Sequence, residues 1–313
     1  MDTPALPENI YVTLHELIEM RRRVSELPLF TAAKQRGALS GLHHSKLRGR
    51  GVDFDQVRIY QPGDDIRTID WRVTARTQEP HTKLFHEERE RPIYLIVEQS
   101  AALFFGSRLA FKSVLAARAA ALIGWAALEH HDRVGGLLFG NQGFSEVRPG
   151  RDKRSLLQLL NQISAHNQAL NTDLAVDPLA LEQALQRARE VLRPGSLAIL
   201  LCDERALTET VEQQLQWLAR RVDVLLLPIS DPLDHRLPRS SLRYQQGKQS
   251  FWINGQQRQF YKAYRQGAFE RQTRWEQLGR RTHSPLMPLS TAFDVLEQLR
   301  AYLLGHPLTG AKT

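Results

Sequence analysis

The sequence contains very little cysteine, since Cys202 is the only one among 313 residues. A single cysteine excludes an internal disulfide, and such usage is typical of a reducing compartment. Long hydrophobic runs are also missing: the most apolar stretch, residues 116–128, contains Arg118 and is too short to cross a bilayer. The first ten residues carry acids and prolines where a secretory signal has a basic and then an apolar segment. We therefore expect a cytoplasmic protein without a membrane span.

Three catalytic motifs are absent from the sequence. There is no Gly-x-x-x-x-Gly-Lys-Ser/Thr loop, so the chain is not expected to hydrolyse ATP itself. There is no Gly-x-Ser-x-Gly elbow, which argues against an α/β-hydrolase. His86 and Glu87 do not begin a His-Glu-x-x-His zinc helix, because Glu90 stands where the second histidine is needed.

The charge of the chain leaves several classes of partner open. A net charge of +8 allows contact with nucleic acid, acidic proteins or membrane surfaces. Basic residues are interspersed with acidic ones, as in residues 87–91, and no nucleic-acid recognition motif accompanies them. We interpret most of this charge as solvated surface. Nucleic-acid binding through the basic surface remains an alternative.

Alternating apolar strands and amphipathic helices dominate the middle of the chain. Residues 93–97 form a continuous apolar run typical of a strand buried on both faces, and residues 112–129 form a long Ala- and Leu-rich helical stretch. The same alternation of strand and helix continues to residue 228. It predicts an α/β fold with a mainly parallel central sheet flanked by helices.

We expect three segments in the chain. Residues 1–40 hold an N-terminal helix and a linker, and residues 41–92 hold a small β-extension with a turn at Pro62 and Gly63. Residues 93–304 form the α/β domain, with a hairpin insertion near 240–256. A helix over residues 260–281 is expected to pack through its aromatic side chains, namely Phe260, Tyr264, Phe269 and Trp275.

Polar residues follow the predicted strands at the end where parallel α/β sheets collect ligands. They lie at 98–100, 171–173 and 203, and the candidate ligand side chains are Glu98, Ser100, Thr172 and Asp203. Carboxylate and hydroxyl oxygens suit Mg²⁺, Mn²⁺ or Ca²⁺. Alternatively, Thr172 caps a helix and the two acids are ordinary loop residues.

Acids and arginines are concentrated between residues 51 and 90. The acids are Asp53, Asp64, Asp65 and Asp70, and the arginines are Arg58, Arg67, Arg72 and Arg76. Paired carboxylates can act as general acid and base. Alternatively, Asp–Arg pairs and helix caps hold an irregular loop in place.

The run of residues 58–76 closely resembles the signature of the DUF58 family, von Willebrand factor A-like proteins often encoded beside MoxR-type AAA+ ATPases. Its motif residues here are Arg58, Tyr60, Pro62, Gly63, Asp64, Asp65, Arg67, Asp70, Trp71 and Arg76. Further matches follow in order, among them the regions of Lys112, Asp132 and Asp231. The resemblance covers residues 41–304.

The resemblance implies a Rossmann-like von Willebrand A domain with a metal-ion-dependent adhesion site. That site uses Asp-x-Ser-x-Ser, a threonine and a further aspartate. Ser100, Thr172 and Asp203 match, but Glu98 replaces the first aspartate and Ala102 replaces the last serine. A longer carboxylate and a lost oxygen ligand weaken binding of Mg²⁺ or Mn²⁺, because Mg²⁺ demands near-ideal octahedral geometry.

The resemblance implies a non-enzymatic interaction module, an adaptor or cofactor of a MoxR-type ATPase with a chaperone-like role in assembling or remodelling a protein complex. The partner surface is expected at the crevice around Glu98, Ser100, Thr172 and Asp203. The alternative is a divalent-metal-dependent hydrolase or nuclease that uses the acids of residues 53–70.

Overall fold

The chain divides into two units, which are described separately. One is Lys46–Glu90, and the other combines Met1–Ser45 with Arg91–Thr313. The computed structural model describes residues 8–26, 53–61, 64–86, 91–246, 249–254 and 258–305. The turn predicted at Pro62 and Gly63 lies outside these residues.

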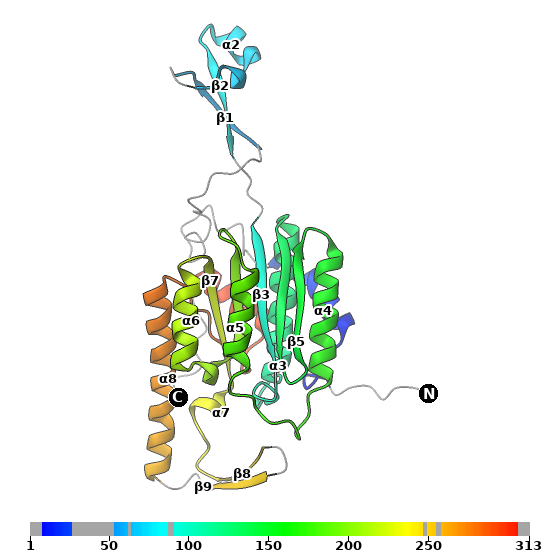
Figure 1. The fold of residues 1–313 in the computed structure, drawn as a ribbon, viewed down its shortest axis with the longest axis vertical. Helices are drawn as coiled ribbons and strands as arrows, with labels where there is room; N and C mark the ends of the chain where they lie inside the picture. Colours follow the sequence, from blue (N-terminus) through cyan, green and yellow to red (C-terminus); the bar gives the residue numbers. More distant parts are fainter. Residues whose placement is uncertain are drawn as a thin grey trace, which may run out of the picture. The chain divides into compact units, whose positions relative to one another are not determined.

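Six strands form the central sheet of the larger unit (Figure 1). In chain order they are β3 Pro92–Gln99, β4 Arg133–Gly140, β5 Gly143–Gly150, β6 Leu197–Asp203, β7 Asp223–Ser230 and β10 Leu289–Ser290. Their order across the sheet is β10-β7-β6-β3-β4-β5. Every neighbouring pair is parallel except β4 and β5, which are antiparallel. The predicted fold class, a mainly parallel sheet in an α/β domain, is confirmed.

Alternate residues of the central strand β3 lie in two different hydrophobic cores. Ile93, Leu95 and Val97 belong to one core, whereas Tyr94 and Ile96 belong to the other. Side chains along a strand point alternately to opposite faces, so β3 has a core on each face. This double burial explains why its apolar run is continuous.

Helices cover both faces of the sheet (Figure 1). The first core includes apolar side chains from α1 Leu14–Glu19, η1 Met20–Glu26, α3 Lys112–Glu129, α4 Lys153–Gln168 and α9 Val295–Leu303. The second core includes apolar side chains from α5 Ala180–Val191, α6 Glu209–Ala219 and α8 Arg258–Thr282. No helix in the described part of the chain combines the length and apolar character that crossing a membrane requires.

Helix α3 is the most deeply buried of these helices, with 15 of its 18 residues buried. Its alanines allow neighbouring elements to approach closely. A Cβ atom added to Gly124 would lie 2.6 Å from the Leu156 Cδ1 atom of α4, so the Leu156 side chain would have to shift. Because the helix begins inside the domain, its first residue, Lys112, is also buried.

Two details differ from the sequence-based expectations. The N-terminal helix is a short α-helix, α1, whose Thr13 cap accepts the Glu16 N–H, and it continues as a 3₁₀ helix. On α8, Trp275 is buried as expected, but Phe260 and Phe269 are 39% and 64% exposed, so the prediction that these two side chains pack was wrong. The inner face of α8 contains Ala268, and the next residue in a helix is rotated by about 100° away from that face.

The smaller unit contains a two-stranded antiparallel sheet, formed by β1 Asp53–Ile59 and β2 His81–His86. A 3₁₀ turn, η4 Ile66–Thr68, and a helix, α2 Trp71–Thr77, lie between the strands in the chain. The sequence predicted a β-extension here but not α2. In the larger unit, the expected hairpin is present as the antiparallel pair β8 Ser241–Gln246 and β9 Gln249–Asn254.

Candidate functional site

Three of the four predicted ligand residues meet at the carboxyl ends of β3 and β6. The Ser100 hydroxyl lies 2.5 Å from Oε1 of Glu98 and donates to it. The backbone N–H of Asp203 donates to Oε2 of Glu98 over 2.7 Å. All three side chains are buried, because adjacent parallel strands end at one edge and bring their last residues together.

Thr172 does not join the other three residues. It is exposed in the loop between α4 and α5, and none of the hydrogen bonds among the described residues involves its side chain. A neighbouring polar contact is internal to the loop, from the Asp173 N–H to Oδ1 of Asn171 over 2.9 Å. Thr172 does not cap α5 either, since that helix begins only at Ala180.

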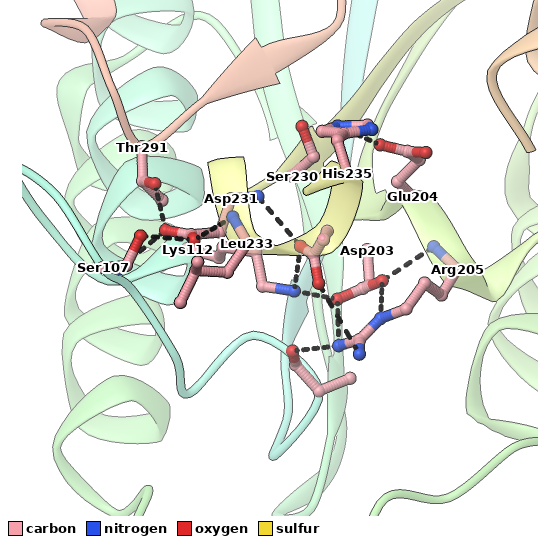
Figure 2. A network of polar contacts seen from close by, with 12 residues as sticks. Ser107, Lys112, Asp203, Glu204, Arg205, Ser230, Asp231, Leu233, His235 and Thr291 are labelled. Carbon is pink, nitrogen blue, oxygen red and sulfur yellow. Dashed lines mark hydrogen bonds and ion pairs between the residues drawn. The ribbon is translucent and has the colours of Figure 1, made fainter. Parts of the chain in front are cut away.

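A buried lysine lies beside the acids (Figure 2). Nζ of Lys112 donates to Oδ2 of Asp203 over 2.6 Å and to Oδ2 of Asp234 over 3.1 Å, and its side chain is 0% exposed. Asp234 belongs to α7 Pro232–His235, which follows β7. The sequence matched Lys112 to the family but gave it no role, because its partners lie 91 and 122 residues further along the chain.

Arginine completes the coordination of Asp203 (Figure 2). Oδ1 of Asp203 accepts the backbone N–H of Arg205 over 2.7 Å and its Nε over 3.1 Å. Nη2 of the same arginine donates to Oδ2 over 3.2 Å. Both carboxylate oxygens of Asp203 are therefore bonded to cationic groups within the chain.

A fourth acid ties the remaining loops of this edge together. Asp231 follows β7 and accepts the N–H of Ser107 over 2.7 Å and the hydroxyl of Ser107 over 2.6 Å. It also accepts the hydroxyl of Thr291, which follows β10. Its own N–H donates to Asp234, which closes a capping box at α7. We call Glu98, Asp203, Asp231 and Asp234 the carboxylate network.

Burial and charge shift the pKa values of this network in opposite directions. Burial, followed by the charge of Asp203, raises the pKa of Glu98 to about 7, although the Ser100 and Asp203 hydrogen bonds oppose the shift. Burial also acts to raise the pKa of Asp203, but Lys112 and Arg205 outweigh it and hold that pKa below its usual value. The pKa of Asp231 is likewise lowered, since hydrogen bonds from Ser107 and Thr291 outweigh its burial.

A divalent ion held by Glu98, Ser100, Thr172 and Asp203 does not fit this arrangement. The oxygens of Asp203 are bonded to Lys112 and Arg205, those of Glu98 accept two other donors, and Thr172 stands apart. Within the described ranges, no group of three or more His, Cys, Asp or Glu side chains is placed to hold a metal ion. The ammonium of Lys112 supplies the positive charge that this cluster needs.

In the smaller unit, three of the four acids organise the backbone. Asp64 accepts the Gln61 N–H over 2.9 Å and Nη2 of Arg58 over 2.7 Å; the first bond, helped by the second, lowers its pKa. Asp65 caps η4 and Asp70 caps α2. The side chain of Asp53 lies outside the description. The interpretation as caps and ion pairs therefore agrees with the geometry.

The other motif residues of the smaller unit differ in exposure. Tyr60 is half-buried, and its N–H donates to the Pro80 carbonyl over 2.8 Å. Arg67 and Arg76 are exposed, and Trp71 is 68% exposed. Pro62 and Gly63 lie outside the described residues.

Several solved structures have a similar chain path. One is the conserved hypothetical protein BatB from Bacteroides thetaiotaomicron, with a TM-score of 0.43 and 11% identity over 69% of this chain and 98% of that one. Another is the SpRpn10 VWA domain, with a TM-score of 0.31 and 10% identity over 67% of this chain and 94% of that one.

Sequence relatives and a family model match a similar part of the chain. Uncharacterised proteins of Mycobacterium bovis and Mycobacterium tuberculosis are 32% identical over 215 residues, or 68% of this chain. The match covers 65% of the length of each of these relatives. The model of the family described as "Protein of unknown function DUF58" matches residues 56–274, from the signature segment into α8. The chain therefore belongs to the DUF58 family.

Proposed function

We propose that this chain is a non-enzymatic, cytoplasmic protein-interaction module that acts as an adaptor or cofactor of a MoxR-type AAA+ ATPase. In this role it contributes to assembly or remodelling of a protein complex. The observation that carries the proposal is the carboxylate network, whose acids are bonded to internal donors. Because these acids are bonded within the domain, we expect them to stabilise its edge. Catalysis would then be carried out by the partner ATPase.

The most reactive-looking pair at this edge is Ser100 with Glu98. A serine next to a carboxylate whose pKa is about 7 has the composition of a nucleophile and its base. However, both side chains are only 4% exposed, and the Ser100 hydroxyl also accepts the Ala102 N–H over 3.1 Å. Burial of both partners therefore favours a structural role.

Exposed apolar side chains surround this edge and suit protein binding. Leu109, in the loop after β3, is 56% exposed, and its N–H donates to the Thr291 carbonyl. Val176 and Leu179, in the loop before α5, are 40% and 51% exposed. Asn141 fixes that loop by accepting the Ala101 N–H and donating to the Ala175 carbonyl. Large apolar side chains on loops held in place are typical of interaction surfaces.

Replacing Leu109 and Leu179 together by glutamate is expected to weaken binding to the ATPase at least about tenfold, because two apolar contacts are lost. The measurement is the Kd between this chain and the purified MoxR-type ATPase of the same organism, with and without ATP. Leu304→Glu is the matched control, since this exposed leucine lies just past α9.

The outcomes of this experiment separate the hypotheses. Unchanged binding by the double variant would place the partner elsewhere on the chain. If the wild type binds no ATPase but cleaves phosphodiesters, the hydrolase or nuclease alternative is correct. Asp64→Asn then tests whether the acids of the smaller unit carry the activity.

Divalent ions are expected to leave the thermal stability of the wild-type protein unchanged. A ligand that binds only the native state raises Tm once its concentration exceeds its Kd. Here Lys112 and Arg205 already bond the carboxylate oxygens of Asp203 that an ion needs. The measurement is Tm with Mg²⁺, with Mn²⁺ and with EDTA. A rise in Tm that Thr172→Ala abolishes would contradict this prediction and restore the metal-ion-dependent site.

A further inference from the structure

A basic and aromatic segment without acids runs from the end of α7 to the middle of α8. Residues 235–269 contain seven lysines and arginines and no aspartate or glutamate. The same 35 residues contain seven aromatic side chains. Residues 27–52, which lie outside the described residues, also contain lysines and arginines without acids, so residues 235–269 are the longer of these two basic stretches.

Helix geometry arranges four of these side chains in one stripe. Arg258, Lys262, Arg265 and Phe269 follow one another at spacings of four, three and four residues. Residues at this spacing lie on the same side of a helix, and the stripe is about 17 Å long. We call these four residues the α8 stripe.

The α8 stripe is unpartnered within the described chain. Its three cations are exposed, and none of them has a hydrogen bond or ion pair with another described residue. The cations of the second half of α8 behave differently. Arg271 donates to the Asp234 carbonyl, Arg274 pairs with Glu212, and Arg280 pairs with Glu276.

Packing holds the stripe in a fixed orientation. Tyr264 donates to the Leu233 carbonyl over 2.7 Å, and the Trp275 indole donates to the Glu204 carbonyl over 2.8 Å. These two residues and Ala268 define the inner face of α8. The stripe lies beside that face, so the domain presents its cations and Phe269 on a rigid, convex rod.

We propose that the α8 stripe binds an acidic amphipathic helix of a partner protein. Three cations without a partner among the described residues, at spacings of four and three residues, match carboxylates at the same spacing on a second helix, as in the salt bridges that flank a coiled-coil seam. Phe269 supplies the apolar anchor at one end, and both aromatic side chains and arginines are enriched at protein interfaces.

Two other classes of anionic partner fit the stripe less well. Non-specific binding of single-stranded nucleic acid follows a basic groove lined with aromatic side chains, whereas the stripe lies on the convex side of a helix. Binding to an anionic membrane surface uses a broad apolar face, and here a single apolar side chain accompanies three cations. This surface is independent of the ATPase proposal, because it shares no residue with Leu109, Val176 or Leu179.

The test uses a fluorescent helical peptide of about three heptads, with glutamates at the seam positions and one leucine opposite Phe269. Binding to the full chain is measured by anisotropy. Neutralising the stripe with Arg258→Gln, Lys262→Gln and Arg265→Gln is expected to weaken binding at least about tenfold, and Phe269→Ala about fivefold. The same peptide with glutamines in place of glutamates is expected not to bind.

A matched triple variant distinguishes specific binding by the α8 stripe from a non-specific effect of the net charge of the protein. Arg148→Gln, Lys153→Gln and Arg154→Gln remove the same charge from exposed positions on β5 and at the start of α4. This variant is expected to bind the peptide like the wild type, as is the Leu109→Glu and Leu179→Glu variant. Equal losses in both triple variants would overturn the proposal. Tighter, stripe-dependent binding of a thymidine oligonucleotide or of phosphatidylserine vesicles would also overturn it and assign the stripe to that partner.

Discussion

Replacing Lys112 with methionine is expected to destabilise the α/β domain by about 3–5 kcal/mol, the usual cost of removing one partner of a buried ion pair. Lys112 is 0% exposed, and the carboxylates of Asp203 and Asp234 that it contacts are also buried. Without the ammonium, two buried acids lose a charge partner that water cannot replace. The measurement is the free energy of unfolding in urea at neutral pH.

Lys153→Met is the matched control for this substitution. Lys153 is the first residue of α4, as Lys112 is the first residue of α3, but it is exposed. It is expected to change stability by less than about 0.5 kcal/mol. Adding Asp203→Asn and Asp234→Asn to Lys112→Met removes the orphaned charges and is expected to restore part of the loss. A loss below about 1 kcal/mol in Lys112→Met would show that the lysine is not essential to the network.

Replacing Glu98 with glutamine is expected to remove a pH dependence from the stability of the domain. The pKa of Glu98 is about 7 in the folded protein and about 4.5 in the unfolded chain, so between these values the folded state binds more protons. Its stabilising contribution is therefore complete below about pH 4.5 and is lost as the pH rises through about 7. Linkage gives a change of the order of 3 kcal/mol across this window.

The comparison with glutamine isolates this contribution from other titrating groups. Glutamine keeps both hydrogen bonds, since its carbonyl accepts the Asp203 N–H and its amide donates to the Ser100 hydroxyl. The difference in unfolding free energy between Glu98→Gln and wild type is measured from pH 5 to 8 and is expected to increase in favour of the variant. Glu209→Gln, at an exposed position in α6, is the control. A constant difference would show that Glu98 does not titrate in this range.

The contribution of Asp203 to stability changes with pH in the opposite direction to that of Glu98, and it does so at lower pH. Its pKa is held below the usual value, chiefly by Lys112 and Arg205, so its contribution is present above about pH 4 and falls as it becomes protonated. The negative charge of the site that contains Glu98 and Asp203 is therefore balanced by the buried Lys112. For the adaptor proposal, this means that partner binding at the edge is expected to survive EDTA.

Much of the fold was predictable because it depends on local periodicity. Residues 112–129 were predicted as a helix and form α3, and the apolar run of residues 93–97 lies inside β3. The convergence of Glu98, Ser100 and Asp203 also followed from pattern, since parallel strands place their carboxyl ends at one edge. The departures from the family pattern, Glu98 and Ala102, were visible in the sequence alone.

Long-range partners could not be predicted from these patterns. Local patterning specifies which segments are strands and helices, and which polar residues stand at strand ends. Tertiary packing places Lys112 against Asp203 and Asp234, keeps Thr172 apart from them and leaves Phe269 exposed. The two differ because periodicity reports only the face of an element on which a residue lies. The identity of the residue it meets depends on how distant elements pack.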